Sequence, residues 1–362
     1  MKILYLNHNV AWSGGTFLRA FPYARGLAAL GHDVTLLTIS RHERFTSSSA
    51  DHQGVRVIET PDLFWGRGRS GWDPWDVLNR MFLVGGERHW DIIHSWDCRP
   101  VAILPALWAK RRAAAHGAKL LTDWADWWGR GGTQTERQGS WMRLIWPIET
   151  YFEEGFRGRA DGTTAISTAL RDRSIQLGAP ASRVRVLPQG CNPPVVRSRS
   201  EARARIGVAA ETRLLLYVGR LNKSDGDLLF PVVQAVLAKR RDARFVMLGN
   251  HGSRIPTDLA QHPAFATLGV VPTSVLDDYV AACDLSIVPL ADTLASQARW
   301  PSKINGFLSA GRAVVTTRVG DLAALLARDS AAFVTEPNVD AIVAGVHHVL
   351  DDAAHRQAIE EA

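Results

Sequence analysis

The sequence predicts an α/β protein built from two doubly wound, mostly parallel-sheet domains. Short apolar segments alternate with helical stretches along the chain, and this alternation stops at a proline-rich break near residue 190 and then starts again. The 362 residues also exceed what a single hydrophobic core ordinarily fills, about 250–300 residues. We therefore expect an N-terminal domain over residues 1–192 and a C-terminal domain over residues 193–362.

The first domain opens with a strand–helix–strand unit. A strand is expected over Ile3–Leu6, a helix over Phe17–Leu30 and a second strand over Asp33–Ile39. A glycine pair, Gly14-Gly15, lies between the first strand and the helix, as in a βαβ unit. These glycines let the backbone approach a ligand closely, and the alternative is a plain tight turn.

The rest of the first domain repeats this alternation with one interruption. Further strands are expected at Val55–Ile58, Asp91–His94, Lys119–Thr122 and Gly162–Ile166, and helices at Arg99–Ala115 and Ser140–Arg157. Residues 60–86 interrupt the pattern with several glycines and with the aromatic residues Phe64, Trp65, Trp72 and Trp75. We expect an insertion loop there, and long irregular loops in compact domains often carry function.

The second domain begins after the segment Leu187–Pro194, whose glycine and paired prolines cannot continue a helix or a central strand. Strands are expected at Arg213–Val218, Arg244–Leu248, Thr267–Gly269, Leu285–Pro289 and Ala313–Thr316, and helices at Leu228–Arg240, Ser274–Ala282, Lys303–Ser309 and Asp340–Glu361. This pattern is again Rossmann-like. Ligands of such sheets bind beyond the carboxyl ends of the strands, and two such domains facing each other form a cleft.

Charge and tryptophan are concentrated in the first domain. The net charge of +6 lies entirely in residues 1–192, and Trp300 is the one tryptophan beyond them. A basic, tryptophan-rich face would suit anionic lipid headgroups or stacked sugar rings, whereas scattered surface arginines and core tryptophans are the simpler interpretation. The basic run Lys110-Arg111-Arg112 favours a peripheral membrane contact. Nucleic acid is not an expected partner, because no nucleic-acid motif accompanies this modest charge.

The remaining composition indicates a cytoplasmic chain, with peripheral contact at the inner membrane face as an addition. No apolar run reaches the ~20 residues of a membrane helix. The three cysteines, Cys98, Cys191 and Cys283, are far apart and predict neither a disulfide framework nor a zinc site. We therefore expect no metal and no cofactor.

Four segments carry a resemblance to a known family. They are Ser13–Gly15, the stretch from Ala165 to Gly190, Leu215–Leu221 with its Val-Gly-Arg, and Pro301–Val315 with its Pro-Ser-Lys. In this order and spacing the chain resembles the retaining glycosyltransferases of family 4, over nearly its whole length. The resemblance implies the GT-B fold, in which two Rossmann-like domains face a cleft, and transfer of a sugar from a nucleotide-diphosphate sugar to an acceptor hydroxyl. It also implies a role in polysaccharide, glycolipid or glycoside biosynthesis.

The resemblance also implies site residues. Arg220 and Lys303 match the family's phosphate-binding positions, and both charges suit a leaving diphosphate. Ser302 is expected to cap the helix that starts at Lys303. Asp126, beyond a strand of the first domain, would contact the sugar or the incoming hydroxyl, with a loop-capping role as the alternative. His94 and Asp97 are weaker candidates. The remaining expected donor contacts are Gly14, Gly15, Gly219, Lys223, Gly269, Val270, Ile304 and Asn305.

The sequence departs from the family at three positions. Ala298 and Gly306 stand where the family has two glutamates, so the sugar and ribose contacts do not follow its pattern. Asp225-Gly226 stands where the family has Lys-Gly, and Lys223 is the expected substitute. A catalytically impaired nucleotide-sugar binder or regulatory homologue therefore remains the second hypothesis. A nucleotide-sugar epimerase is a weaker third, because it would need paired carboxylates and histidines.

Overall fold

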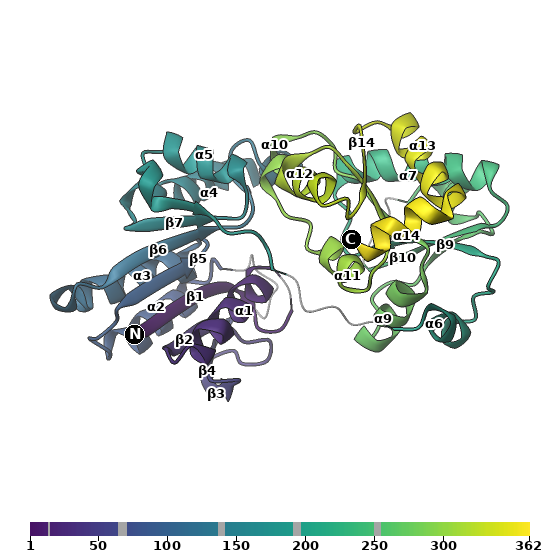
Figure 1. The fold of residues 1–362 in the computed structure, drawn as a ribbon. Coiled ribbons are helices and arrows are strands. Elements are labelled where there is room, and N and C mark those ends of the chain that lie inside the picture. Colours follow the sequence, from purple (N-terminus) through teal and green to yellow (C-terminus); the bar gives the residue numbers. More distant parts are fainter. Residues whose placement is uncertain (14, 64–70, 137–141, 191–196, 250–254) are drawn as a thin grey trace. The chain divides into compact units, whose positions relative to one another are not determined.

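The computed structural model describes residues 1–13, 15–63, 71–136, 142–190, 197–249 and 255–362. Its chain divides into two compact units, Met1–Gly190 and Cys191–Ala362. Each unit contains one sheet with helices packed on it (Figure 1). The predicted fold class, two doubly wound α/β sheets that are mostly parallel, is confirmed.

Unit 1 contains an eight-stranded sheet in the order β3-β4-β2-β1-β5-β6-β7-β8. Its pairs are parallel except for the antiparallel pair β3–β4 at one edge, which the sequence reasoning missed. The strands are β1 (Lys2–Val10), β2 (Asp33–Ile39), β3 (Ser48–His52), β4 (Val55–Thr60), β5 (Ile92–Trp96), β6 (Lys119–Trp124), β7 (Gly162–Ala165) and β8 (Val184–Val186). The helices are α1 (Thr16–Ala29), α2 (Pro74–Gly85), α3 (Pro100–Arg112), α4 (Met142–Glu154) and α5 (Thr168–Gln176).

Strand β1 shows why the sheet is covered on both faces. Ile3 and Tyr5 pack into a cluster with Phe17 of α1, whereas Leu4 and Leu6 pack into a cluster on the opposite face with residues of α3. Successive side chains of a strand point to opposite faces, so an uninterrupted apolar run needs helices on both sides. The run Ile3–Leu6 therefore makes β1 a central strand.

Unit 2 contains a six-stranded, fully parallel sheet in the order β11-β10-β9-β12-β13-β14. Leu215 and Tyr217 of β9 face one core cluster, and Leu214 and Leu216 face the other. The strands are β9 (Arg213–Val218), β10 (Ala243–Leu248), β11 (Phe265–Thr267), β12 (Leu285–Val288), β13 (Val314–Thr317) and β14 (Phe333–Thr335). The helices are α6 (Arg199–Ile206), α7 (Lys223–Lys239), α8 (Thr257–Ala260), α9 (Thr273–Ala282), α10 (Leu294–Ala298), α11 (Lys303–Ser309), α12 (Gly320–Arg328), α13 (Val339–Asp351) and α14 (Ala353–Glu361).

Two predictions about elements were wrong. Much of the predicted insertion loop is helix α2, which begins after Asp73, whose side chain accepts a hydrogen bond from Trp75 N, and has Pro74 in its first turn. These are ordinary helix-start signals, which the nearby glycines obscured. Phe64 and Trp65 lie outside the described residues.

The single helix predicted over Asp340–Glu361 is instead two helices, α13 and α14, separated by Asp352. Asp352 has extended backbone angles, and its carboxylate accepts a hydrogen bond from His355 N at the start of α14. An aspartate in this position satisfies the amides that a new helix leaves open, and therefore favours the break. In Figure 1 the two helices, drawn in yellow, run in different directions.

Candidate functional site

Three neighbouring strands of unit 2 end in glycines with left-handed backbone angles. Gly219 follows β9, Gly249 follows β10 and Gly269 lies just beyond β11, with φ values of 93°, 120° and 64°. A Cβ on Gly249 would lie 2.8 Å from Gly219 O, and Gly249 N donates to Gly269 O at 2.7 Å. No other residue type fits at Gly249, so the carboxyl edge of this sheet is bare backbone that a ligand can approach.

Lys303 lies against this edge. Helix α11 begins at Lys303, whose Nζ contacts the Tyr217 hydroxyl and donates to Arg220 O at 3.0 Å. The ammonium group is 4.0 Å from the centre of the Tyr217 ring, and its Cε would lie 3.7 Å from a Cβ on Gly219. Two segments that were predicted separately, Val-Gly-Arg and Pro-Ser-Lys, thus meet at one place.

The pKa of Lys303 is lowered to about 7. Burial is the largest cause, and Arg299 adds to it, while Asp225 acts in the opposite direction. Removing a cation from water disfavours its charged form. A nearby anion would restore the charge, so this lysine is suited to a ligand that brings negative charge with it.

Arg299 is a cation of this edge that the sequence reasoning missed. Its guanidinium forms an ion pair with the buried carboxylate of Asp225, which also accepts from Ala291 N at 3.3 Å. Within the described part of the chain, the buried Nε of Arg299 has no hydrogen-bond partner. Asp225 stands where the resemblance expects a lysine, and here it serves as the counter-ion of Arg299. The available signal for Arg299 was its position in the sequence, one residue after Ala298.

The other expected donor contacts divide into two groups. The Arg220 side chain is exposed, and among the described residues it has no ion pair or side-chain hydrogen bond, so it is available to a ligand. Val270 is 84% exposed next to Gly269. Lys223, by contrast, is paired with Asp227 at 2.7 Å on the exposed face of α7. It therefore already has an exposed carboxylate partner, and exposed ion pairs of this kind are weak.

Residues at the start of α11 have mainly structural partners. Ser302 makes no capping hydrogen bond, so the predicted cap was wrong, because its backbone is already helical and the side chain does not turn back. Ile304 is buried in the core. Asn305 Oδ1 accepts from Trp300 Nε1 at 3.0 Å. Of the two glutamate positions, Ala298 is buried, whereas Gly306 is exposed and has open space around its Cα.

In unit 1 the turn after β1 is held by an asparagine. Asn9 Oδ1 accepts from Thr16 N at 2.7 Å and from Thr16 Oγ1 at 2.8 Å. Gly15 has φ 57°, and a Cβ there would lie 2.4 Å from Asn9 Oδ1. The backbone angle therefore favours glycine at this position, and any larger residue would also displace the Asn9 side chain. Gly14 lies outside the described residues.

Asp97 follows β5 and lies close to two arginines and a histidine. Its carboxylate lies 3.7 Å from His8 Nδ1, 3.6 Å from Arg99 Nε and 3.4 Å from Arg157. Burial alone would raise the pKa of Asp97, but the basic neighbours outweigh it and lower this pKa. Burial has the opposite effect on the histidine and lowers the pKa of His8 to about 3. Asp97 also has a left-handed φ of 80°, a costly conformation for aspartate that often marks functional sites.

Two aspartates, Asp123 within β6 and Asp126 just beyond it, have different environments. Asp123 is fully buried and accepts two hydrogen bonds from Arg19, at 2.9 and 3.0 Å, and one from Thr164. Asp126 is exposed beyond the end of the strand. Asp123 is therefore structural, while Asp126 is accessible to a substrate. His94 is buried, with burial lowering its pKa to about 4, and it stacks on Trp96 as a structural residue.

Glu153 of α4 fixes the loop that carries Asp126. Its carboxylate accepts from Trp128 N, Gly129 N and Trp124 Nε1. Burial raises the pKa of Glu153 to about 8 even though the hydrogen bonds from Trp128 and Trp124 act to lower it. No sequence pattern pointed to Glu153, since its contacts form between elements that are separate along the chain.

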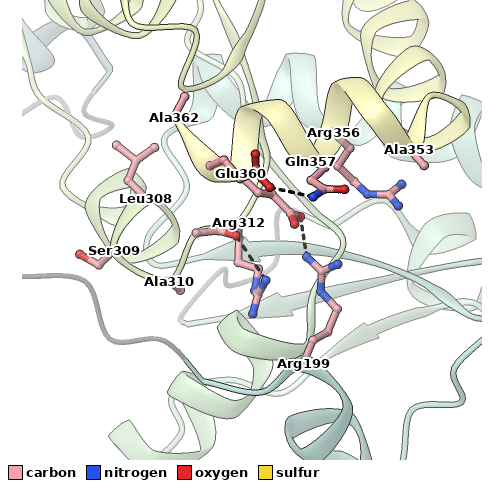
Figure 2. Close-up of a pocket in the computed structure, with 12 residues that line it drawn as sticks. Arg199, Leu308, Ser309, Ala310, Arg312, Ala353, Arg356, Gln357, Glu360 and Ala362 are labelled. Carbon is pink, nitrogen blue, oxygen red and sulfur yellow. Dashed lines mark hydrogen bonds and ion pairs between the residues drawn. The ribbon is translucent and has the colours of Figure 1, made fainter.

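A cavity of about 730 Å³ lies at the opposite, amino edge of the unit 2 sheet. Figure 2 shows Arg199 and Arg312 on one side of α14, with Glu360 bonded to Arg199. Arg312 precedes β13, so this cavity lies at the far end of the strands from Gly219 and Lys303. It is distinct from the glycine edge described above. Within the described residues, no helix has the length and apolarity to cross a bilayer.

Comparisons with known proteins agree with this geometry. A glycosyl transferase 4-like domain model matches residues 14–190, and a glycosyl transferases group 1 model matches residues 212–352. No curated protein matches the chain.

Solved structures share the fold across both units. Sucrose-phosphate synthase from Thermosynechococcus elongatus is 15% identical with a TM-score of 0.70, over 99% of this chain and 92% of that one. Anabaena HepE in complex with UDP and glucose is 18% identical with a TM-score of 0.68, over 99% and 92%. WaaG, a glycosyltransferase of lipopolysaccharide biosynthesis, is 16% identical with a TM-score of 0.62, over 99% and 93%. The two matched domains and the shared fold together identify this chain as a GT-B glycosyltransferase.

Proposed function

We propose that the chain transfers a sugar from a nucleotide-diphosphate sugar to an acceptor hydroxyl with retention of configuration, as a member of glycosyltransferase family 4. The observation that carries the proposal is the cationic edge of unit 2, where Lys303 lies against Gly219 and Tyr217 and the exposed Arg220 follows. Departure of a nucleoside diphosphate places negative charge where these cations stand. Preorganised charges aimed at a leaving group are a large source of catalysis.

The assignment of roles follows from accessibility and charge. Arg220 and Lys303 would hold the diphosphate, and Gly219, Gly269 and Val270 would let the nucleotide approach the strand ends. Asp126 would contact the acceptor hydroxyl or the sugar. The donor-side residues belong to unit 2 and the acceptor-side residues to unit 1. No metal or cofactor takes part in this proposal.

The test is a thermal-shift panel of nucleotide sugars followed by turnover. UDP-glucose is the first donor to try, because HepE was solved with it. We expect one donor class to raise the unfolding temperature, and release of nucleoside diphosphate to require an acceptor. Substitutions Arg220→Ala and Lys303→Ala should abolish turnover, with Lys223→Ala as the matched control. Unchanged turnover in both variants would refute the assignment.

A non-catalytic nucleotide-sugar binder is the second candidate. Ala298 and Gly306 favour it, because the two carboxylates of the family pattern are absent. Tight donor binding by calorimetry without transfer to any acceptor in a broad panel would select it over the transferase.

Helix α2 supports a contact between unit 1 and an anionic membrane from the cytoplasmic side. Trp75, Leu78 and Phe82 are 44%, 61% and 85% exposed, and their spacing places them on one face of the helix. An apolar helix face on a basic unit suits an anionic bilayer, where acyl chains and headgroups match both properties. Lys110, by contrast, is paired with Asp161, and Trp72 packs on Phe152, so neither carries the contact.

Flotation with vesicles containing phosphatidylserine tests this contact. We expect binding that weakens with salt and that is lost in the triple substitution Trp75→Ser, Leu78→Ser, Phe82→Ser. Equal flotation of the variant, or no flotation of the native chain, would remove the membrane from the proposal. A lipid-linked acceptor would follow from a positive result, with glycolipid or polysaccharide synthesis as the corresponding process.

A further inference from the structure

The corner between α13 and α14 brings together three side chains that suit a transition metal. His348 lies near the end of α13, Asp352 separates the helices and His355 lies in the first turn of α14. One ligand atom from each residue lies within 4.8 Å of the others. The two ring nitrogens, His348 Nε2 and His355 Nδ1, are 2.8 Å apart.

The break at Asp352 creates this proximity. In a continuous helix, residues seven apart are separated by about 10.5 Å along the axis, at ~1.5 Å per residue. The side chains of His348 and His355 could then not direct nitrogens at one point. The corner turns α14 against the end of α13, and the same aspartate that starts α14 becomes the third member of the cluster.

Packing already orients both imidazole rings. Phe333 of β14 contacts the His348 ring at a centroid distance of 5.2 Å and the His355 ring at 5.7 Å. The two histidine rings meet edge to face at 76°. Such ring contacts restrict rotation of the imidazoles, so less side-chain freedom is lost when an ion binds.

We propose that His348, Asp352 and His355 form a binding site for a divalent transition metal, with Zn²⁺ as the fitting ion. Two imidazole nitrogens and one carboxylate are a common zinc ligand set, with water as the fourth ligand. Zinc–nitrogen bonds of about 2.0–2.1 Å in a tetrahedral arrangement separate two ligand nitrogens by roughly 3.3 Å. The ring nitrogens thus need to move apart by only about half an ångström from their 2.8 Å separation.

Binding requires the proton between the two rings to leave. In the metal-free pair one ring nitrogen donates to the other. When zinc binds through His348 Nε2 and His355 Nδ1, each neutral ring keeps its proton on the opposite nitrogen. Asp352 retains its capping bond through Oδ1 to His355 N, and a carboxylate has further lone pairs that can bind the ion.

The site would fix α14 to the rest of unit 2. Helix α14 buries Ile359 in the core cluster and holds Arg199 through Glu360. None of the residues assigned to the donor lies in this corner, so the metal is structural and independent of sugar transfer. A ligand that binds only the folded chain stabilises it, and the unfolding temperature should rise with zinc concentration.

Calorimetric titration of the tag-free, metal-stripped full chain with Zn²⁺ tests the proposal. We expect one ion per chain at micromolar zinc, a rise in unfolding temperature, and visible absorption bands of tetrahedral Co²⁺ when cobalt replaces zinc. The double variant His348→Ala, His355→Ala should lose all three signals, and His347→Ala, a neighbour outside the cluster, should keep them.

Asp352→Asn provides the sharper variant. Asparagine keeps the capping oxygen and so keeps the corner, but it removes the anionic ligand. We expect its zinc affinity to fall by about tenfold or more, since even outer-shell changes cost 10–100-fold. Stoichiometric zinc binding that persists in the double variant would overturn the proposal. So would the absence of binding to the native chain, or an Asp352→Asn variant with unchanged affinity and circular dichroism.

Discussion

Replacing Lys303 by methionine tests whether a partly neutral lysine receives the donor diphosphate. With a pKa of about 7, Lys303 is charged in about ten of eleven molecules at pH 6 and in about one of eleven at pH 8. A nucleotide sugar has both phosphates esterified, so its own charge is constant over this range. If the bound diphosphate restores the lysine's charge, binding above pH 7 takes up one proton.

The expected magnitude follows from these populations. The dissociation constant of the nucleotide sugar should rise about tenfold from pH 6 to pH 8, which corresponds to ~1.4 kcal/mol. Lys303→Met should bind more weakly at pH 6 and lose this pH dependence. Lys223→Met is the matched control, because Lys223 is exposed and paired with Asp227, and it should keep the native slope.

Isothermal calorimetry at pH 6, 7 and 8 in two buffers of different ionisation enthalpy measures both the affinity and the proton uptake. We expect uptake of about half a proton at pH 7 and nearly one at pH 8 in the native chain, and none in Lys303→Met. A pH slope that survives in Lys303→Met, or native binding without proton uptake, would refute the role of this lysine.

Three further predictions concern stability, turnover and donor binding. Lys303→Met should raise the unfolding temperature at pH 7. The folded-state pKa of Lys303 lies below the ordinary lysine value, so the unfolded chain binds more protons and the stability of the native chain rises with pH above about 7. A thermal scan across pH 6–10 checks the sign, and a lower unfolding temperature for the variant would contradict it. Asp123→Asn should lose about 3–5 kcal/mol of unfolding free energy, measured in urea, because it leaves Arg19 buried without a counter-ion. Asp126→Asn should change the unfolding free energy by under ~0.5 kcal/mol while reducing turnover. A large stability loss in Asp126→Asn would instead make that residue structural. Gly249→Ala should destabilise unit 2 by about 1–3 kcal/mol and weaken donor binding, because the new Cβ would lie 2.8 Å from Gly219 O. Gly306→Ala is the control and should be neutral or stabilising, because its helical site is open. Equal stability losses in the two variants would show that the glycine edge is not constrained.

The sequence alone determined the fold class and the strands that end at the glycine edge of unit 2. Uninterrupted apolar runs such as Ile3–Leu6 and Leu214–Tyr217 can be buried only in a parallel sheet covered on both faces. The glycine that follows such a strand is likewise visible in the sequence, because a left-handed backbone angle at a strand end favours glycine. Helix α2 was missed because tryptophans and glycines around Asp73-Pro74 hid an ordinary helix start.

The tertiary structure decided the charge states and partners of the site residues. No local pattern could reveal that Arg299 pairs with Asp225, that Glu153 holds the loop of Asp126, or that burial lowers the pKa of Lys303. These properties depend on contacts between residues far apart in the chain and on the exclusion of water, which a one-dimensional spacing does not record. The His348–Asp352–His355 cluster shows the same limit at short range: helical periodicity continues through residue 352, and only the capped break turns two distant histidines toward one point.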